Sequence, residues 1–196
     1  MNHALRCMAL GAALLVAGPV AHATIIQYHA VLTGADESPA NASPGTGFAS
    51  VVTDDVADTM EVHVTFSGLL GMTSASHIHC CTTLPLTGTA GVATTTPRFA
   101  GFPTGVAAGS YDIVLDMTLA SSYNPVFITA HGGTTAAAEA FLFSGMALQE
   151  SYFNIHTNLF PGGEIRGFLI QIPEPESLAL LGLGLAGLAF SRRKAT

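Results

Sequence analysis

The sequence predicts an all-β fold for the middle of the chain, between Thr24 and Gln171. This stretch is rich in Thr, Ala, Gly and Ser and poor in the Lys, Glu and Gln residues that exposed helices prefer. Several of its segments alternate apolar and polar residues with the period of two that a half-buried strand requires. Turn sequences rich in Gly and Pro separate these segments, which is typical of antiparallel sandwiches and barrels.

We expect strands at residues 25–32, 47–53, 61–66, 75–80, 111–117, 126–130 and 164–170. The turns between them are predicted at residues 43–45 (SPG), 101–103 (GFP), 132–133 (GG) and 161–163 (PGG). The alternation is clearest in residues 61–66, where Val62, Val64 and Phe66 share one face. One segment differs, because residues 134–147 contain five alanines and are predicted to form a helical turn or two.

The last hairpin is the clearest element, with strands at residues 151–157 and 164–170 and a turn at 158–163. The period of two places Tyr152, Asn154 and His156 on one face of the first strand. On the return strand, Glu164 and Arg166 share a face. This pair is typical of a structural salt bridge or hydrogen-bond anchor, and no second catalytic carboxylate is identifiable near it.

The N-terminus has the three parts of a cleavable signal peptide. Arg6 provides the positive charge, residues 8–16 are apolar, and Ala21-His22-Ala23 forms a cleavage site after the helix-breaking Pro19. The alternative is an uncleaved membrane anchor, for which the apolar run is short. We therefore expect residues 1–23 to be a signal helix, 24–171 to be the β domain and 172–196 to be a separate C-terminal segment.

That C-terminal segment begins with Pro173-Glu174-Pro175, continues as a short apolar helix and ends in a basic cluster with Arg192 and Arg193. It resembles a PEP-CTERM sorting signal. The resemblance implies a Gram-negative bacterium, cleavage by an exosortase, membrane attachment through this segment before processing, and final placement at the cell surface or in the extracellular matrix. The alternative is an ordinary single-pass membrane tail, for which the apolar run is again short.

The domain itself resembles the CHRD (chordin-like) domain through "YHAVLTGADESP", "SASHIHC" and "YFNIHTNLFPGGEIRGFL". The resemblance spans residues 24–171 and implies an immunoglobulin-like antiparallel β-sandwich, with Asn154, Glu164 and Arg166 in the terminal hairpin motif. It implies no settled biochemical activity. Cys80-Cys81, directly after His79, departs from the Gly-rich segment expected there, so the residues following the His-Ile-His do not transfer simply.

His77 and His79 are the strongest candidates for chemistry. Their spacing of two directs both imidazoles to the same side of a strand, and His156 is the candidate third ligand. Imidazole suits copper, zinc or iron, and under this metal hypothesis the cofactor is a copper or zinc ion. The alternative is that these histidines form hydrogen bonds that fix the hairpin to its neighbour.

Cys80 and Cys81 are adjacent in a chain that is exported to an oxidising compartment. As thiolates beside the histidines they would be ligands for a soft metal. The alternatives are a disulfide between neighbours or two thiols in a loop, and the sequence favours these.

The composition excludes nucleic-acid binding. Arg98 and Arg166 are the only basic residues between Thr24 and Gln171, against eleven acidic ones. The first hypothesis is therefore a non-enzymatic binding or structural module whose partner is exopolysaccharide or a surface protein. The alternative is a metal-binding or redox protein that uses the His-Ile-His segment, and an enzyme with an unrecognised site has little support.

Overall fold

The computed structural model describes residues 25–173, which form one antiparallel sheet with three short helical elements. The strands follow the order β4-β6-β7-β1-β2-β3-β5 across the sheet, and the short β8 also pairs with β1. The strands are β1 (Ile25–Thr33), β2 (Thr46–Asp54), β3 (Thr59–Ser67), β4 (Thr73–His79), β5 (Gly109–Asp116), β6 (Tyr152–Thr157), β7 (Ile165–Phe168) and β8 (Ile170–Gln171).

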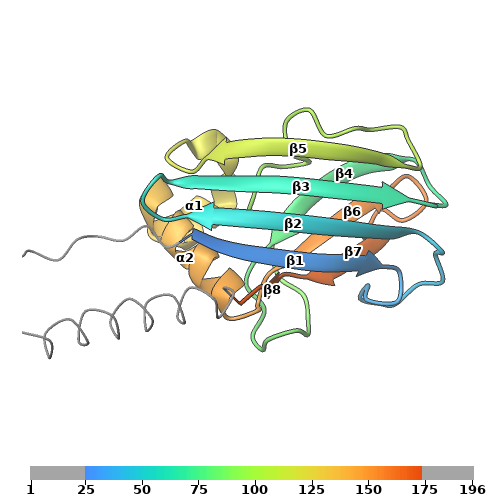
Figure 1. Cartoon of the computed structure of the whole chain (residues 1–196), viewed down its shortest axis with the longest axis horizontal. Coiled ribbons are helices and arrows are strands. Elements are labelled where there is room, and N and C mark those ends of the chain that lie inside the picture. Colours follow the sequence, from blue (N-terminus) through green and yellow to red (C-terminus); the bar gives the residue numbers. More distant parts are fainter. Residues whose placement is uncertain (1–24, 174–196) are drawn as a thin grey trace, which may run out of the picture.

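The sheet curls into two facing layers (Figure 1). Strands β1, β2, β3 and β5 form one layer, and β4, β6 and β7 form the layer behind it. The layers join where β1 meets the C-terminal hairpin, with Thr33 opposite Arg166 and His29 opposite Ile170. The predicted antiparallel sandwich is confirmed. The expected signal helix and C-terminal apolar helix lie outside the described residues.

The first layer shows the alternation that its sequence predicts. Tyr28, Ala30 and Leu32 of β1 are buried, as are Val62 and Val64 of β3, while the residues between them are more exposed. Because successive strand residues point to opposite faces, one face of this layer lines the core and the other meets solvent.

In the second layer, β6 is buried on both faces. Its inward side chains, Phe153 and Ile155, pack in the core together with Ile78 of β4 and Ile165 of β7. The outward face of this layer carries polar side chains that loops cover rather than solvent, since a ring nitrogen of each of His77, His79 and His156 bonds to a loop carbonyl, those of Pro97, Ala90 and Pro161 respectively. The candidate functional residues lie on this outward face.

The strand predicted at residues 126–130 is wrong, because the segment forms helix α1 (Pro125–Ala130). Asn124 immediately before it accepts a hydrogen bond from the backbone N–H of Val126, and Pro125 occupies the first helical turn. An Asn cap followed by Pro is a helix-start signal, which outweighs the β propensity of the Val and Ile residues that follow.

The helix expected near residues 134–147 is present as α2 (Thr135–Ala147), longer than the one or two turns predicted. The Thr134 side chain caps it by accepting from the N–H of Ala137. Leu142 and Met146 are fully buried, so α2 closes one end of the core (Figure 1). A short 3-10 helix, η1 (Ala120–Ser122), precedes α1.

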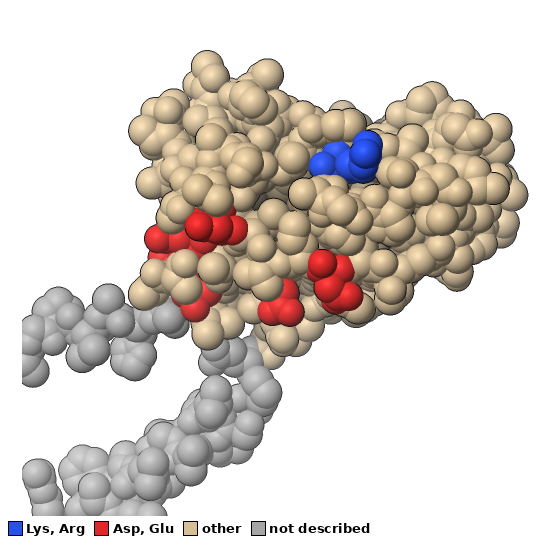
Figure 2. All heavy atoms as spheres, turned by 90° about the horizontal axis from the view of Figure 1, so that it is seen from above, with Lys and Arg blue, Asp and Glu red and all other residues tan. Residues whose placement is uncertain are grey.

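Acidic side chains gather along one side of the domain in the view of Figure 2, and the basic atoms visible there occupy one small area. Arg98 is exposed and Arg166 is buried. In the part of the chain from residue 25 to 173, no helix has both the length and the apolar character needed to cross a bilayer.

Candidate metal centre

The pairing of β4 with β6 brings His77, His79 and His156 together. In this antiparallel register His77 lies opposite Asn154, and His156 lies opposite Ala75. His156 is therefore the diagonal neighbour of His77 on the same face of the sheet. One ring nitrogen from each histidine lies within 4.8 Å of the other two, and all three residues are buried or half-buried.

Each imidazole is held from behind by a backbone carbonyl. Nδ1 of His77 lies 3.1 Å from the carbonyl oxygen of Pro97, Nδ1 of His79 lies 2.8 Å from that of Ala90, and Nδ1 of His156 lies 3.0 Å from that of Pro161. A carbonyl oxygen can only accept a hydrogen bond, so each Nδ1 carries the proton. Each neutral ring consequently presents an unprotonated Nε2 to the space between the three histidines.

These Nε2 atoms lack suitable partners among residues 25–173. Nε2 of His77 and Nε2 of His156 are 2.9 Å apart, which places two lone pairs against each other. Nε2 of His79 is buried and has no hydrogen-bond partner in the described chain. Unpaired buried acceptors are rare in folded proteins because each one loses its hydrogen bonds to water.

Protonation of one imidazole would give the facing lone pairs a donor, but burial opposes it. Burial, together with the neighbouring His79 and His156, lowers the pKa of His77 to about 3. Burial also lowers the pKa of His79 to about 4 and lowers that of His156. The three rings are therefore neutral near pH 7.

The geometry fits a metal ion with nitrogen ligands. Two ligands about 2.0 Å from a metal at a tetrahedral angle lie about 3.3 Å apart. The His77 and His156 nitrogens would need to separate by a few tenths of an ångström, and the nitrogen pairs that include His79, which lie within 4.8 Å, would need to close by up to about 1.5 Å. Histidines that ligate metals commonly donate their second ring N–H to a carbonyl, which fixes the tautomer and the orientation of the ring. His77, His79 and His156 all have this second partner.

His29, His63 and His131, the remaining histidines of the described chain, lie outside this group. His63 pairs with the exposed Asp112, and His131 stacks on Phe141. His29 stacks on Phe48. The group of three therefore comes from β4 and β6 alone.

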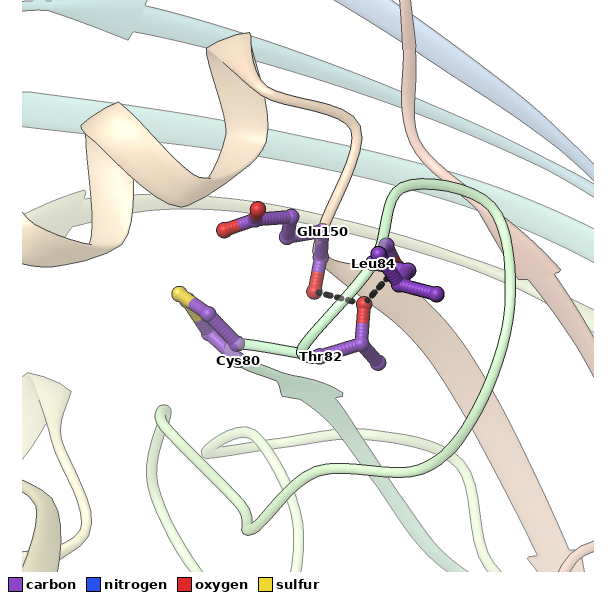
Figure 3. The surroundings of a disulfide bond; sticks show 5 residues. Cys80, Thr82, Leu84 and Glu150 are labelled. Carbon is purple, nitrogen blue, oxygen red and sulfur yellow. Dashed lines mark hydrogen bonds between the residues drawn. A yellow bond between two sulfur atoms is a disulfide. The ribbon is translucent and has the colours of Figure 1, made fainter.

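Cys80 and Cys81 form a disulfide rather than a pair of thiolates (Figure 3). Both sulfur atoms pack against the backbone of α2 at Gly145. The next residue, Thr82, donates from its hydroxyl to the carbonyl oxygen of Leu84 at 2.7 Å and to that of Glu150 at 3.4 Å. The metal group contains neither cysteine.

Glu164 lies at the turn of the last hairpin and is completely buried. Its carboxylate accepts from the hydroxyls of Ser43 and Thr157 and from the backbone N–H groups of Leu70 and Gly71. Although burial opposes ionisation, these four donors together lower its pKa. Glu164 therefore ties three segments of the chain together, and its partners do not include Arg166.

Arg166 extends away from Glu164 beneath the loops. Its guanidinium donates to the carbonyl oxygens of Asp36 and Gly88 and lies 4.7 Å from the centre of the Tyr152 ring. The carboxylate paired with it is that of Glu37, whose Oε2 is 4.0 Å from Nε of Arg166. Asn154 lies on β6, opposite His77 of β4 on one side and Arg166 of β7 on the other, and its buried side-chain oxygen has no partner among residues 25–173.

Sequence reasoning named the three histidines but missed the groups that support them. The carbonyls of Ala90, Pro97 and Pro161 are backbone atoms, and no side-chain pattern signals them. Glu37 carried one weak signal, since it belongs to the opening "ADESP" segment of the family resemblance.

Comparison with known families gives two matches. The model of the CHRD domain matches residues 28–169, and that of the PEP-CTERM protein-sorting motif matches residues 171–194. The sorting motif indicates an exported, membrane-transiting protein of a Gram-negative bacterium that an exosortase processes. No curated protein and no solved structure matches the chain.

Proposed function

The chain belongs to the CHRD domain family, and from this premise we propose that its exported β domain binds one copper or zinc ion through His77, His79 and His156. The observation that carries the proposal is the facing pair of Nε2 atoms of His77 and His156, 2.9 Å apart, with the unpartnered Nε2 of His79 beside them in the described chain. A bound cation would satisfy all three lone pairs at once.

The choice of copper or zinc follows from the ligand type. Three neutral imidazoles are typical of zinc and copper sites, whereas calcium and magnesium prefer oxygen ligands. The same three histidines would remain as hydrogen-bonding residues under the structural alternative, but that role leaves the Nε2 atoms without donors. We therefore place the metal hypothesis ahead of the structural one.

Metal content after export tests the proposal. The full chain is secreted to a bacterial periplasm, purified without chelator or His-tag, and analysed by elemental mass spectrometry. We expect about one copper or zinc per chain, lost in the His77→Ala/His79→Ala variant and in His156→Ala. His63→Ala is the matched control, because His63 lies on the exposed face of β3 and should leave the metal in place.

A native protein that contains no metal and takes up neither ion on reconstitution would refute the proposal. A variant that loses the metal must also remain folded, which circular dichroism checks. Equal metal content in the triad variants and the His63 control would locate binding elsewhere.

We also propose that the domain acts at the cell surface or in the extracellular matrix as a binding module rather than an enzyme. The sorting motif supports this placement, and exopolysaccharide or another surface protein is the partner that it suggests. Fractionation of cells with and without the exosortase tests the placement, and retention of the exported protein on isolated matrix polysaccharide tests the partner. Protein that stays in the periplasm regardless of the exosortase would contradict the placement, and no retention on the polysaccharide would contradict that partner.

A further inference from the structure

The ligand set of the candidate metal centre carries no negative charge. Within residues 25–173 the group able to hold a metal consists of His77, His79 and His156, without a carboxylate or thiolate. Cys80 and Cys81 are joined to each other and cannot serve as thiolates. A divalent ion held by three neutral imidazoles would therefore keep its full charge of two in a buried place, which is costly unless other groups offset it.

The guanidinium of Arg166 is buried nearby and increases that cost, because its charge is also positive. Arg166 is only 5% exposed, and its guanidinium carbon lies 4.7 Å from the centre of the Tyr152 ring. The ring of His79 stacks on Tyr152, with centres 4.6 Å apart and an angle of 9° between the ring planes. These two contacts place the guanidinium carbon within about 10 Å of the His79 ring.

Arg166 would repel a metal cation bound at His79, because both charges are positive and the Tyr152 ring alone links their positions. This repulsion grows with the charge of the metal cation.

Among the described residues, the carboxylate of Glu37 offsets Arg166, and it does so weakly. Oε2 of Glu37 is 4.0 Å from Nε of Arg166, while its Oε1 is buried with no hydrogen-bond partner in residues 25–173. Burial raises the pKa of Glu37 to about 7 against the opposing attraction of Arg166. Near neutral pH, Glu37 therefore carries only part of a negative charge.

From this arrangement we infer that the site selects Cu(I) over Zn(II), and that Arg166 sets this preference through its charge; the inference rests on the proposed metal centre. Cu(I) brings one positive charge instead of two and is satisfied by three nitrogen donors. Zn(II) normally takes a fourth ligand. At an effective dielectric constant of about 20, a second unit charge about 10 Å from a guanidinium weakens binding roughly tenfold.

Competition between chelators measures the preference. The exported full chain is loaded with Cu(I) under anaerobic conditions or with Zn(II), and each affinity is determined against a colorimetric chelator of that ion. The wild type is expected to bind Cu(I) more tightly than Zn(II). Arg166→Met should strengthen Zn(II) binding about tenfold more than Cu(I) binding, and Arg166→Lys, which keeps the charge, should leave the ratio of the two affinities near that of the wild type.

Glu37→Gln tests the same electrostatic effect by removing negative charge instead of positive charge. This test does not depend on the folding of the Arg166 variants. Removal of its partial negative charge should weaken Zn(II) binding more than Cu(I) binding. A wild type that prefers Zn(II), or a ratio that is unchanged in both Arg166→Met and Glu37→Gln, would overturn the inference and leave the metal centre standing. A wild type that binds neither ion would overturn the proposed function itself.

Discussion

Gly145 allows the packing of the disulfide against α2 to be tested by a substitution whose effect should change sign. A Cβ atom added at Gly145 would lie 2.6 Å from Sγ of Cys80 and closer still to Sγ of Cys81. Within a helix interior, however, Ala is more favourable than Gly by about 1 kcal/mol. The two effects oppose each other, and only the first depends on the sulfur atoms.

In the wild-type background, Gly145→Ala should destabilise the protein by about 1–3 kcal/mol, the usual cost of overpacking. In a Cys80→Ala/Cys81→Ala background the sulfur atoms are gone, and the nearest remaining side-chain atom is Cβ of residue 81 at 3.3 Å. There the same substitution should stabilise the protein by up to about 1 kcal/mol. The expected coupling energy is therefore about 2–4 kcal/mol.

Urea unfolding of the four proteins, followed by circular dichroism without reductant, gives this coupling energy. A Gly145→Ala effect of the same sign in both backgrounds, with a coupling energy below about 0.5 kcal/mol, would refute the packing argument. Mass spectrometry of the unreduced wild type provides the control that the two sulfurs are joined.

Three further predictions concern stability. Glu164→Gln should lower the free energy of unfolding in urea at pH 7 by about 3 kcal/mol or more, because the side-chain N–H groups of Gln would face donors whose hydrogen bonds the carboxylate accepts. Glu61→Gln on the exposed face of β3 should change little. Because the pKa of Glu164 is lowered in the folded state, its contribution is present above the unfolded value of about 4.5 and is lost as the pH falls through the folded value; a Glu164→Gln penalty that is equally large at pH 3 and pH 7 would contradict this. Glu139 behaves in the opposite way, because burial, and then Asp58 and Asp55, raise its pKa to about 7. The folded state therefore holds the proton of Glu139 more tightly than the unfolded state, and the stability of the protein is highest below pH 4.5 and falls as the pH rises through 7. Glu139→Gln should accordingly match the wild type near pH 4 and exceed it by up to about 3 kcal/mol at pH 8, and a pH-independent difference would exclude this explanation. Finally, a hundredfold excess of the bound metal over its dissociation constant should stabilise the fold by about 2.7 kcal/mol, seen as a higher melting temperature that chelator reverses in the wild type but that is absent in His156→Ala.

The strands could be predicted because their burial follows a simple period. In residues 61–66 the sequence alternates, and the structure buries Val62, Val64 and Phe66 as that alternation requires. Residues 126–130 show where this reasoning fails. Their Val and Ile residues favour a strand, but Asn124 and Pro125 begin a helix, and a local cap decides the conformation of so short a segment.

The candidate site was only partly predictable. The spacing of His77 and His79 shows that they share a face of their strand, but only the register of β4 against β6 places His156 diagonally beside His77. The charge that surrounds the site depends on the loop that brings Glu37 to Arg166, two residues far apart in the sequence. Period and motif do not encode such long-range loop contacts.

The pairing of β1 with the C-terminal hairpin has a consequence for export. The first described strand receives its second neighbours, β7 and β8, from the last part of the domain, and the N–H of Ile172 bonds to the carbonyl oxygen of Gln27. A chain that crosses the membrane from its N-terminus cannot close its sheet until residue 172 has emerged, because loop closure must precede this contact. The matched sorting motif begins at residue 171, so the signal that directs processing starts where the last strand of the sheet ends.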